Sequence, residues 1–506
     1  MPSTIGKKLN ITVWGESHSP EIGITIKGLP KGLIIDLDEV QRFLDRRKGG
    51  QNAYSTKRQE ADKPFIKCGV TAGKDGASSG TVNTTGEEGI SSGIVKTTGE
   101  DLTAIFYNSN VRKTDYEEMK YIPRPSHADY TSYVKYGDSK DRSGGGMFSG
   151  RLTLPLCFAG AVCMNYLRTL GIDIFGHVSS VGPVEDDGFD LCKPNKESIG
   201  KDFPVINVEK GAKIVELMTS CAAEGDSVGG SIECAVTGLK AGIGEPLYDS
   251  MESVLSHYIF GIPAVKGIEF GSGFKVSEMK GSECNDPFII RDGKVATKTN
   301  HSGGIQGGIS NGMPVIFRVA IKPTPSIYKE QQTVNMKELT ETTLSLKGRH
   351  DPCIVPRALP CVEAVTAIAL TELILTAGNS FEYRGNDNCF ADEENGENGE
   401  NDKRRSGEES LKKEETLGAL RLEIDAIDAK VSELLSRRMD VAASIAMQKL
   451  KEGTPVKNPA REQIVLDSVE KKAGEEKGKH VREVYRKLIE ETCLYEEEIM
   501  EGKKLC

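Results

Sequence analysis

The sequence predicts an α+β domain followed by an all-α module of three helices, and three features lead to this prediction. Glycine is concentrated in the first 380 residues, where short glycine-rich runs alternate with β-branched and apolar segments. Residues 384–415 carry 11 acidic and 6 basic side chains and almost no apolar ones. After Thr416 glycine nearly vanishes, and apolar residues recur at spacings of three and four, the period of an amphipathic helix.

Strand composition in the first domain predicts strands at 22–28, 231–237 and 314–322. Helical length and spacing predict helices at 38–47 and 156–171. The apolar stretch 362–377 carries Glu363 and Glu372 and is shorter than the roughly 18 uncharged residues of a membrane span, so it is predicted to be a core helix. No segment is therefore expected to cross a membrane.

The acidic segment cannot bury enough apolar surface to offset the loss of chain entropy, so it predicts a disordered linker. This linker, residues 381–415, separates the predicted domains 1–380 and 416–500. The apolar period from Leu417 to Ile445 predicts one long helix that ends near residues 453–455, a Gly-Thr-Pro sequence. Further helices are expected at 459–473 and 480–500, and residues 501–506 form a C-terminal tail.

Composition limits the class of protein and its surroundings. A chain of 506 residues is expected to hold two to four domains, and its net charge of −10 argues for solubility and against a nucleic-acid partner. The twelve cysteines include no Cys-x-x-Cys pair and no metal-like spacing, so neither a zinc site nor a disulfide framework is expected. The N-terminus has no secretion or transit signal, which predicts a cytoplasmic protein.

Six short blocks carry the residue types of a site that binds anions and moves protons. Any one of them alone is typical of a surface turn, but all six occur in a fixed order at 15–18, 124–131, 225–230, 263–267, 303–312 and 349–357. Together they resemble chorismate synthase over about residues 1–380, which implies a β-α-β sandwich fold. The resemblance further implies elimination of phosphate from 5-enolpyruvylshikimate 3-phosphate by an anti 1,4 route. This reaction needs reduced FMN although it involves no net redox change, and NADPH is a candidate reductant for the flavin.

An anionic substrate stacked on an anionic flavin requires fixed cations, and arginine binds phosphate and carboxylate in a forked geometry. Protons must also move in both directions near neutral pH, for which histidine is suited. Of the seven histidines, His18 and His127 match the family's catalytic pair, and Asp351 matches its catalytic carboxylate. The resemblance places substrate contacts on Ser17, Arg124 and Arg151. It places flavin contacts on Arg47, Met147, Phe148, Ser149, Pro263, Ala264, Gly307, Lys322, Pro323, Thr324, Pro325, Ser326 and Arg349.

The blocks depart from the usual family pattern at several positions. Ser19 and Ser126 each stand where glycine is common, and Ala53 stands where many relatives carry a second substrate-facing arginine, whose role could pass to Arg58. The stretch 147–150 also differs from the frequent Arg-Ser-Ser-Ala. These departures weaken the assignment of NADPH and of an intrinsic flavin reductase.

The helical region resembles AroQ-type chorismate mutase over residues 416–500. The resemblance implies that its cations hold chorismate during the Claisen rearrangement to prephenate, with catalytic positions at Arg421, Arg438, Lys449 and Glu496 and substrate contacts at Asn458, Arg461 and Thr492. Asn458 replaces a carboxylate of some members, and Glu496 stands where others carry glutamine. At 1.5 Å per residue, Arg421 and Arg438 lie about 25 Å apart on one helix, too far to grip one ligand. The site therefore needs a second chain.

The leading interpretation is a bifunctional enzyme that makes chorismate and converts it to prephenate. A second interpretation keeps the synthase but makes the helical module a regulatory domain that binds an aromatic end product without catalysis. A third is a generic phosphate-binding flavoprotein fused to a helical oligomerisation domain. The expected partners are small-molecule substrates and further copies of the chain, as synthase tetramers and mutase dimers.

Overall fold

The computed structural model describes residues 3–50, 61–72, 80–82, 88–108, 121–137, 143–346, 351–377 and 417–500. The chain divides into two compact units, Met1–Asn395 and Gly396–Cys506. The predicted linker 381–415 and the tail 501–506 lie outside the described residues.

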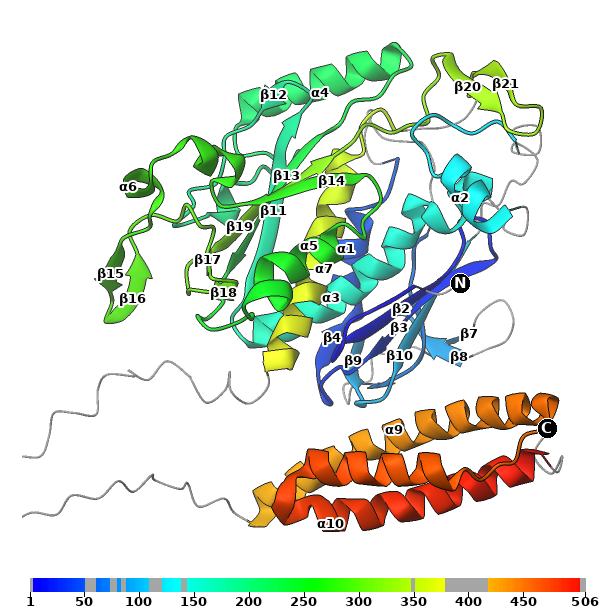
Figure 1. Ribbon diagram of the computed structural model, residues 1–506. Coiled ribbons are helices and arrows are strands. Elements are labelled where there is room, and N and C mark those ends of the chain that lie inside the picture. The colour runs from blue at the N-terminus through cyan, green and yellow to red at the C-terminus, as the bar shows by residue number, and fades with distance from the viewer. Residues whose placement is uncertain are drawn as a thin grey trace, which may run out of the picture. The chain divides into compact units, whose positions relative to one another are not determined.

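The N-terminal part of the first unit forms an antiparallel sheet with the strand order β1–β2–β3–β10–β5–β8–β7 (Figure 1). Its strands are β1 (Ser3–Ile5), β2 (Asn10–Gly15), β3 (Glu21–Lys27), β5 (Phe65–Cys68), β7 (Gly80–Val82), β8 (Glu88–Ile90) and β10 (Leu102–Tyr107). A three-stranded sheet in the order β4–β9–β6 contains β4 (Ile34–Asp36), β6 (Val70–Ala72) and β9 (Ile94–Thr97). The strand predicted at 22–28 is confirmed as β3.

The second large sheet has the order β12–β11–β13–β19–β14 and is also antiparallel. Its strands are β11 (Asp173–Val181), β12 (Val184–Glu185), β13 (Gly230–Thr237), β14 (Val265–Phe270) and β19 (Val315–Ile321). Three hairpins project from the unit: β15 (Phe288–Arg291) with β16 (Lys294–Thr297), β17 (Ile305–Gln306) with β18 (Ile309–Ser310), and β20 (Gln331–Asn335) with β21 (Thr340–Leu344). The strands predicted at 231–237 and 314–322 are confirmed as β13 and β19.

Helices fill the space between the two large sheets (Figure 1). Helix α3 (Thr153–Thr169) packs on β2, β3 and β10, and α7 (Val355–Ala377) packs on β11 and β13. The two helices cross in direct backbone contact, because a β-carbon on Gly160 would lie 2.3 Å from the Cα atom of Ala364. The remaining helices are α1 (Leu37–Asp45), α2 (Asp129–Tyr136), α4 (Val208–Ala223), α5 (Met251–Ile259) and α6 (Gly281–Cys284). This arrangement confirms the β-α-β sandwich.

Helix α7 contains the apolar stretch predicted to be a core helix. Among the described residues it is long and apolar enough to cross a membrane by length and composition, but 94% of its most apolar window is buried inside the structure. Its two acidic residues are both satisfied there. Glu363 accepts hydrogen bonds from Arg46 and from the backbone of Gly176, and Glu372 accepts from the backbone N–H groups of residues 7–9.

The second unit consists of α9 (Leu417–Glu452) and α10 (Pro459–Met500), which pack against each other. Helix α9 is followed directly by Gly453, whose φ of 67° is the left-handed conformation that glycine adopts readily after a helix C-terminus. Gly474, with φ 80° and ψ 171°, breaks α10 into two helical parts. The prediction of three helices is therefore confirmed, except that the third begins soon after Gly474 rather than at His480.

Candidate active site

Three side chains of the 124–131 block form a compact hydrogen-bonded group at the start of α2. The Asp129 carboxylate accepts from Arg124 Nε at 2.7 Å and from Arg124 Nη2 at 2.9 Å. His127 Nδ1 lies 2.8 Å from the same carboxylate. Burial alone would raise the pKa of Asp129, but hydrogen bonds from Arg124 and His127 hold it well below its ordinary value. The group therefore combines a fixed cation, a carboxylate anion and an imidazole.

The glycine run at residues 144–146 joins this group to the first block. A β-carbon on Gly145 would lie 3.5 Å from both Cε1 and Nε2 of His127, so the run passes directly beside the edge of the imidazole. The Gly146 carbonyl accepts a hydrogen bond from the Ser17 backbone N–H at 3.1 Å. Ser17 and its neighbour His18 are both buried. The structure thus brings the 15–18 and 124–131 blocks to the same glycine run.

Lys322 and the residues after it form the next side of the site. Its ammonium group donates to the backbone carbonyl of Ser126 and, at 3.0 Å, to the Ser126 hydroxyl. Burial, followed by the charge of Lys266, lowers the pKa of Lys322. The Lys322 N–H donates to the Ala264 carbonyl at 2.9 Å, which joins the 263–267 block to the site.

The loop that follows Lys322 connects two further blocks. Ser326 is buried, and its hydroxyl oxygen lies 3.4 Å from Arg124 Nη1. The Ser227 hydroxyl donates to the Thr324 carbonyl at 2.7 Å. Pro323 and Pro325 flank Thr324 in this loop. The Val228 N–H in turn donates to the Pro352 carbonyl at 2.8 Å. These contacts join the 225–230 and 349–357 blocks to the group around Arg124.

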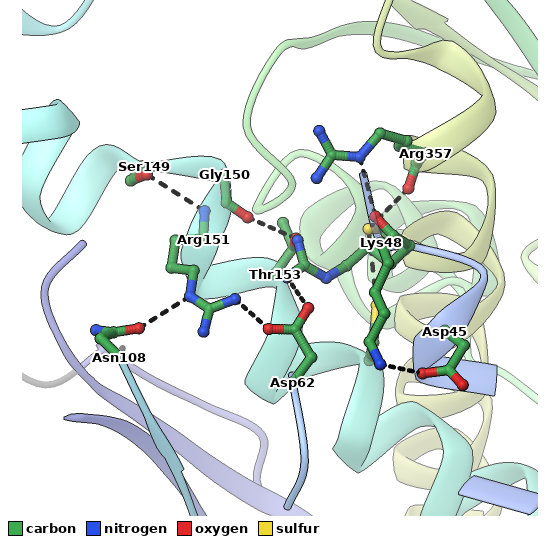
Figure 2. Close-up of polar contacts among 12 residues, drawn as sticks. Asp45, Lys48, Asp62, Asn108, Ser149, Gly150, Arg151, Thr153 and Arg357 are labelled. Carbon is green, nitrogen blue, oxygen red and sulfur yellow. Dashed lines mark hydrogen bonds and ion pairs between the residues drawn. The ribbon is translucent and has the colours of Figure 1, made fainter. Parts of the chain in front are cut away.

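A second, fully buried cluster lies around Asp62 (Figure 2). Asp62 accepts from Arg151 through one oxygen and from Arg47 through the other, at 3.3 Å. Arg151 also donates from Nε to Asn108 at 3.0 Å, while the Ser149 hydroxyl accepts from its backbone N–H at 3.3 Å. The side chains of Arg47, Asp62 and Arg151 are each 7% exposed or less.

Asp351 belongs to the margin of this cluster. Its carboxylate accepts from Arg357 Nη1, and Arg357 Nε donates to the Arg47 carbonyl at 2.9 Å. Arg47 Nε is buried and has no hydrogen-bond partner among the described residues. Arg47 and Arg151 therefore share the Asp62 carboxylate, and one buried donor of Arg47 is left for another acceptor.

Not every predicted residue joins these clusters. Gly307 lies in the β17–β18 hairpin, which contacts the start of α5 through a hydrogen bond from Met251 to Gly308 and lies away from α2 (Figure 1). Met147 and Phe148 end the 3₁₀ turn at Ser143–Phe148, and the Phe148 ring lies 6.5 Å from that of Tyr136. Pro263 precedes Ala264. Arg349 and the positions 53 and 58 lie outside the described residues.

Sequence reasoning missed Asp62, Asn108 and the role of Asp129. Asp62 and Asn108 are 89 and 43 residues distant from Arg151 in sequence, so no local pattern could have linked them. Asp129 stands two residues after His127, and an acidic residue so close to a candidate catalytic histidine was a usable signal.

The helical module gathers polar groups between α9 and the last part of α10. Lys449 donates to the Glu496 carboxylate at 2.8 Å and to the Val456 carbonyl at 2.7 Å. Arg438 donates to the Thr492 hydroxyl. Thr492 and Glu496 are both buried, one helical turn apart on α10. The structure therefore brings together four of the residues that the sequence assigned to a mutase site.

The remaining three mutase positions are placed differently. The Asn458 side chain accepts from the Arg461 N–H at 3.1 Å, and the Glu462 carboxylate accepts from the Asn458 N–H at 3.2 Å. This reciprocal pattern caps the start of α10. The Arg461 side chain is exposed, and the Arg421 side chain lies outside the described residues.

Comparison with known proteins matches each of the two units to a protein family. The family profile described as chorismate synthase matches residues 9–85 and 81–375, and the profile described as chorismate mutase type II matches residues 420–497. A chorismate synthase of Lachnoclostridium phytofermentans is 44% identical over 379 residues, which cover 75% of this chain and 96% of that protein. A chorismate synthase of Dehalococcoides mccartyi is 41% identical over 383 residues, 75% of this chain and 98% of that protein.

A solved structure described as a crystal structure of chorismate synthase shares the fold. Its TM-score is 0.53 at 22% sequence identity, and the match covers 74% of this chain and 93% of that one. Fold and site together define an enzyme with a cation-rich, histidine-bearing centre on a β-α-β sandwich, joined to a helical module. The chain belongs to the chorismate synthase family and carries a chorismate mutase type II domain at its C-terminal end.

Proposed function

We propose that the first unit eliminates phosphate from 5-enolpyruvylshikimate 3-phosphate with the help of reduced FMN. The convergence of His127, Asp129 and Arg124 with Ser17 and His18 at one glycine run carries this proposal. The cations that two anionic molecules require are supplied by Arg47, Arg124, Arg151 and Lys322. The hydroxyls of serines 17, 126, 149 and 326 supply neutral hydrogen-bonding groups.

The residues present fit an FMN molecule. The unpartnered Nε of Arg47 offers a buried donor, and the absence of a β-carbon at Gly145 leaves the imidazole edge of His127 open. Lys322, Ala264 and the loop to Ser326 would hold the flavin, and Arg124 and Arg151 the phosphate and carboxylate groups of the substrate. When bound, reduced FMN would supply the reduced flavin ring that this elimination requires, although the overall reaction involves no net redox change. His18 and His127 would exchange protons with the reacting groups, since imidazole does so near neutral pH.

The test is anaerobic turnover of 5-enolpyruvylshikimate 3-phosphate with reduced FMN. His127→Ala should lower the rate by at least about 10²-fold, the usual share of a general acid or base. His257→Ala, which changes an exposed histidine of α5, is the matched control and should retain full activity. A folded His127→Ala variant that turns over at the wild-type rate would remove His127 from the mechanism.

Flavin binding can be followed separately from turnover through the chain's single tryptophan. Trp14 packs on Gly23 and lies three residues before Ser17. FMN should quench its fluorescence in a saturable manner, and Arg47→Ala should weaken the apparent affinity. Quenching that does not saturate would argue against a flavin site beside the first block.

We propose that the second unit rearranges chorismate to prephenate. Arg438, Lys449, Thr492 and Glu496 converge from two facing helices, and this convergence carries the proposal. The rearrangement needs no covalent catalysis. It needs a compact substrate conformer and cations at the carboxylates and the breaking C–O bond.

A second copy of the module is expected to complete the site. Helix α9 exposes the apolar side chains of Val431 (44%), Leu435 (36%), Val441 (54%) and Ile445 (44%), which a partner helix would cover. The separation of about 25 Å between Arg421 and Arg438 along the helix also calls for a partner chain. We propose mutase dimers within a cytoplasmic synthase tetramer, as the family resemblance suggests.

Turnover of chorismate alone, followed by the loss of its absorbance, tests this second activity. Lys449→Ala should abolish it, because the cation at the ether oxygen is lost, while Lys457→Ala should not. Lys457 is the matched control, since its exposed ammonium pairs only loosely with Glu497, at 3.5 Å. If the wild-type protein binds an aromatic end product but leaves chorismate unchanged, the module is regulatory.

A further inference from the structure

The Asp129 carboxylate occupies a position that no assigned role of the site explains. Its side chain is only 14% exposed and each of its oxygens has a different set of donors. Oδ2 accepts from the backbone N–H of Arg124 at 3.0 Å and from Arg124 Nε at 2.7 Å. Oδ1 faces Arg124 Nη2 at 2.9 Å and His127 Nδ1 at 2.8 Å.

The three atoms Oδ1, Nη2 and Nδ1 form a triangle, because Arg124 Nη2 also lies 3.1 Å from His127 Nδ1. A guanidinium can only donate and an ionised carboxylate can only accept. If Arg124 donated to Nδ1, a bare imidazole nitrogen would face a carboxylate oxygen at 2.8 Å, and two acceptors would repel each other. If Nδ1 carries the proton, Oδ1 accepts from both neighbours and every group is satisfied. The second arrangement is therefore the stable one.

This arrangement leaves Nε2 as the only basic nitrogen of the neutral His127 ring. Nε2 and its neighbour Cε1 form the edge of the ring beside the glycine run, where a β-carbon on Gly145 would lie 3.5 Å from each. The same run holds the Ser17 backbone through the Gly146 carbonyl. The unprotonated nitrogen therefore lies on the ring edge beside the run that the 15–18 block also contacts.

We propose that Asp129 is a positioning residue that fixes His127 in the Nδ1-protonated tautomer and aims its unprotonated Nε2 at the reacting groups. Arg124 supports this role by holding both oxygens of the carboxylate, which orients Oδ1 toward the imidazole. The inference rests on the proposed function of His127, but the tautomer itself can be measured without turnover.

Asp129→Asn provides a sharp test because the geometry dictates how the amide will sit. The Oδ2 position receives two N–H donors from Arg124, whereas the Oδ1 position receives one, from Nη2, so we expect the amide oxygen at the Oδ2 position. The amide NH2 then occupies the Oδ1 position and donates to His127 Nδ1. The proton is thereby forced onto Nε2, and the ring changes tautomer with almost no change in shape.

The measurement is ¹⁵N NMR of the full-length protein labelled at histidine, at alkaline pH where the imidazole is neutral. The chain has seven histidines, and the signals of His127 are identified by their loss in His127→Ala. Wild type should show a protonated Nδ1 and an unprotonated Nε2, and Asp129→Asn the reverse. Synthase kcat should fall by about 10³-fold in that variant with little change in KM, as expected for a misplaced proton.

Asp187→Asn is the matched control, since Asp187 forms an exposed ion pair with Lys210 at 2.7 Å and should leave both the spectrum and the rate unchanged. A wild-type His127 protonated on Nε2, or an unchanged tautomer in Asp129→Asn, would overturn the positioning role. Reversed tautomers with an unchanged rate would uphold that role and would instead contradict the proposed function of His127.

Discussion

The two units organise their cations in different ways. In the first unit Arg47, Arg124 and Arg151 pair with carboxylates of the same chain and are at most 12% exposed, and contacts spanning up to 310 residues fix the site from within. In the second unit Arg438 and Lys449 lie on one long helix whose apolar side chains remain exposed along much of its length. The supporting contacts of the first site therefore lie within its own unit, whereas we propose that a second chain completes the second site.

The two activities should therefore be sensitive to different changes in the protein. A site held by buried long-range contacts should respond to changes in the core of its own domain. A site that is shared across an unpartnered helix should respond to whether two chains meet.

The largest effect is expected from complementation between mutase variants. Full-length Arg421→Ala and Arg438→Ala should each lose nearly all mutase turnover. Because a two-fold dimer of the two variants holds one intact site and one doubly altered site, random mixing should restore about a quarter of the wild-type rate. Mixing is done by co-expression, and synthase turnover in the same samples is the control. Recovery that never exceeds the sum of the separate variants would contradict a shared site.

Glu496 should make the mutase reaction depend on pH. Its carboxylate accepts from Lys449, and it can donate to a developing oxygen charge only when protonated. Turnover should therefore fall as pH rises, whereas Glu496→Gln, a permanent donor of similar shape, should give a flatter profile on the alkaline side. Identical profiles of kcat/KM for the two proteins would exclude Glu496 from the site.

His177 should contribute to the stability of the first unit and not to that of the second. Its imidazole is completely buried. Nδ1 lies 3.1 Å from the Asp186 carboxylate, and Nε2 lies 3.0 Å from the Glu233 carboxylate. Burial opposes its charge, but the hydrogen bonds that the imidazole donates to the two carboxylates raise the pKa of His177 overall. The stabilisation is present at low pH and is lost as pH rises through this raised pKa. His177→Gln should cost on the order of 3 kcal/mol near pH 6, with a smaller cost at alkaline pH.

Urea unfolding of the first unit across this pH range measures the effect of His177, with the exposed His257→Gln as control. A cost that grows with pH would show that His177 is neutral in the folded protein.

Gly160→Ala should have a smaller effect on the same unit. The new methyl group would overlap the backbone of Ala364, where α3 and α7 touch, and such overpacking costs about 1–3 kcal/mol. Gly281→Ala is the matched control, because its β-carbon would meet nothing within 4 Å. Synthase activity should be lost at a lower temperature than in wild type, while the thermal profile of mutase activity should not move. A shift of both profiles would show that the units unfold together.

Local sequence signals predicted the elements of this fold well. The strands β3, β13 and β19 were predicted from their strand composition, and the long helix α9 from the helical spacing of its apolar residues. The end of the second helix at residue 473 was predicted correctly, but the start of the third was placed too late, at 480, since several residues after Gly474 keep helical geometry without an apolar signal.

The supporting contacts of the site could not be predicted in this way. Ser126 adopts φ 60°, a conformation unfavourable for a residue with a β-carbon, at a position where the resemblance to chorismate synthase led us to expect glycine. Its hydroxyl accepts from Lys322, 196 residues further along the chain. The sequence revealed the departure from glycine but not this partner, just as it revealed Arg151 but not Asp62. Such pairs exist only after the sheets and helices have packed.

We propose that one chain carries two separate active sites, which catalyse consecutive reactions. The most direct measurement assays both reactions, synthase turnover with reduced FMN and mutase turnover with chorismate alone, in full-length His127→Ala and Lys449→Ala proteins. Each variant should lose one activity by at least about 10²-fold and keep the other at the wild-type rate. A folded variant that loses both activities, or keeps both, would contradict the account.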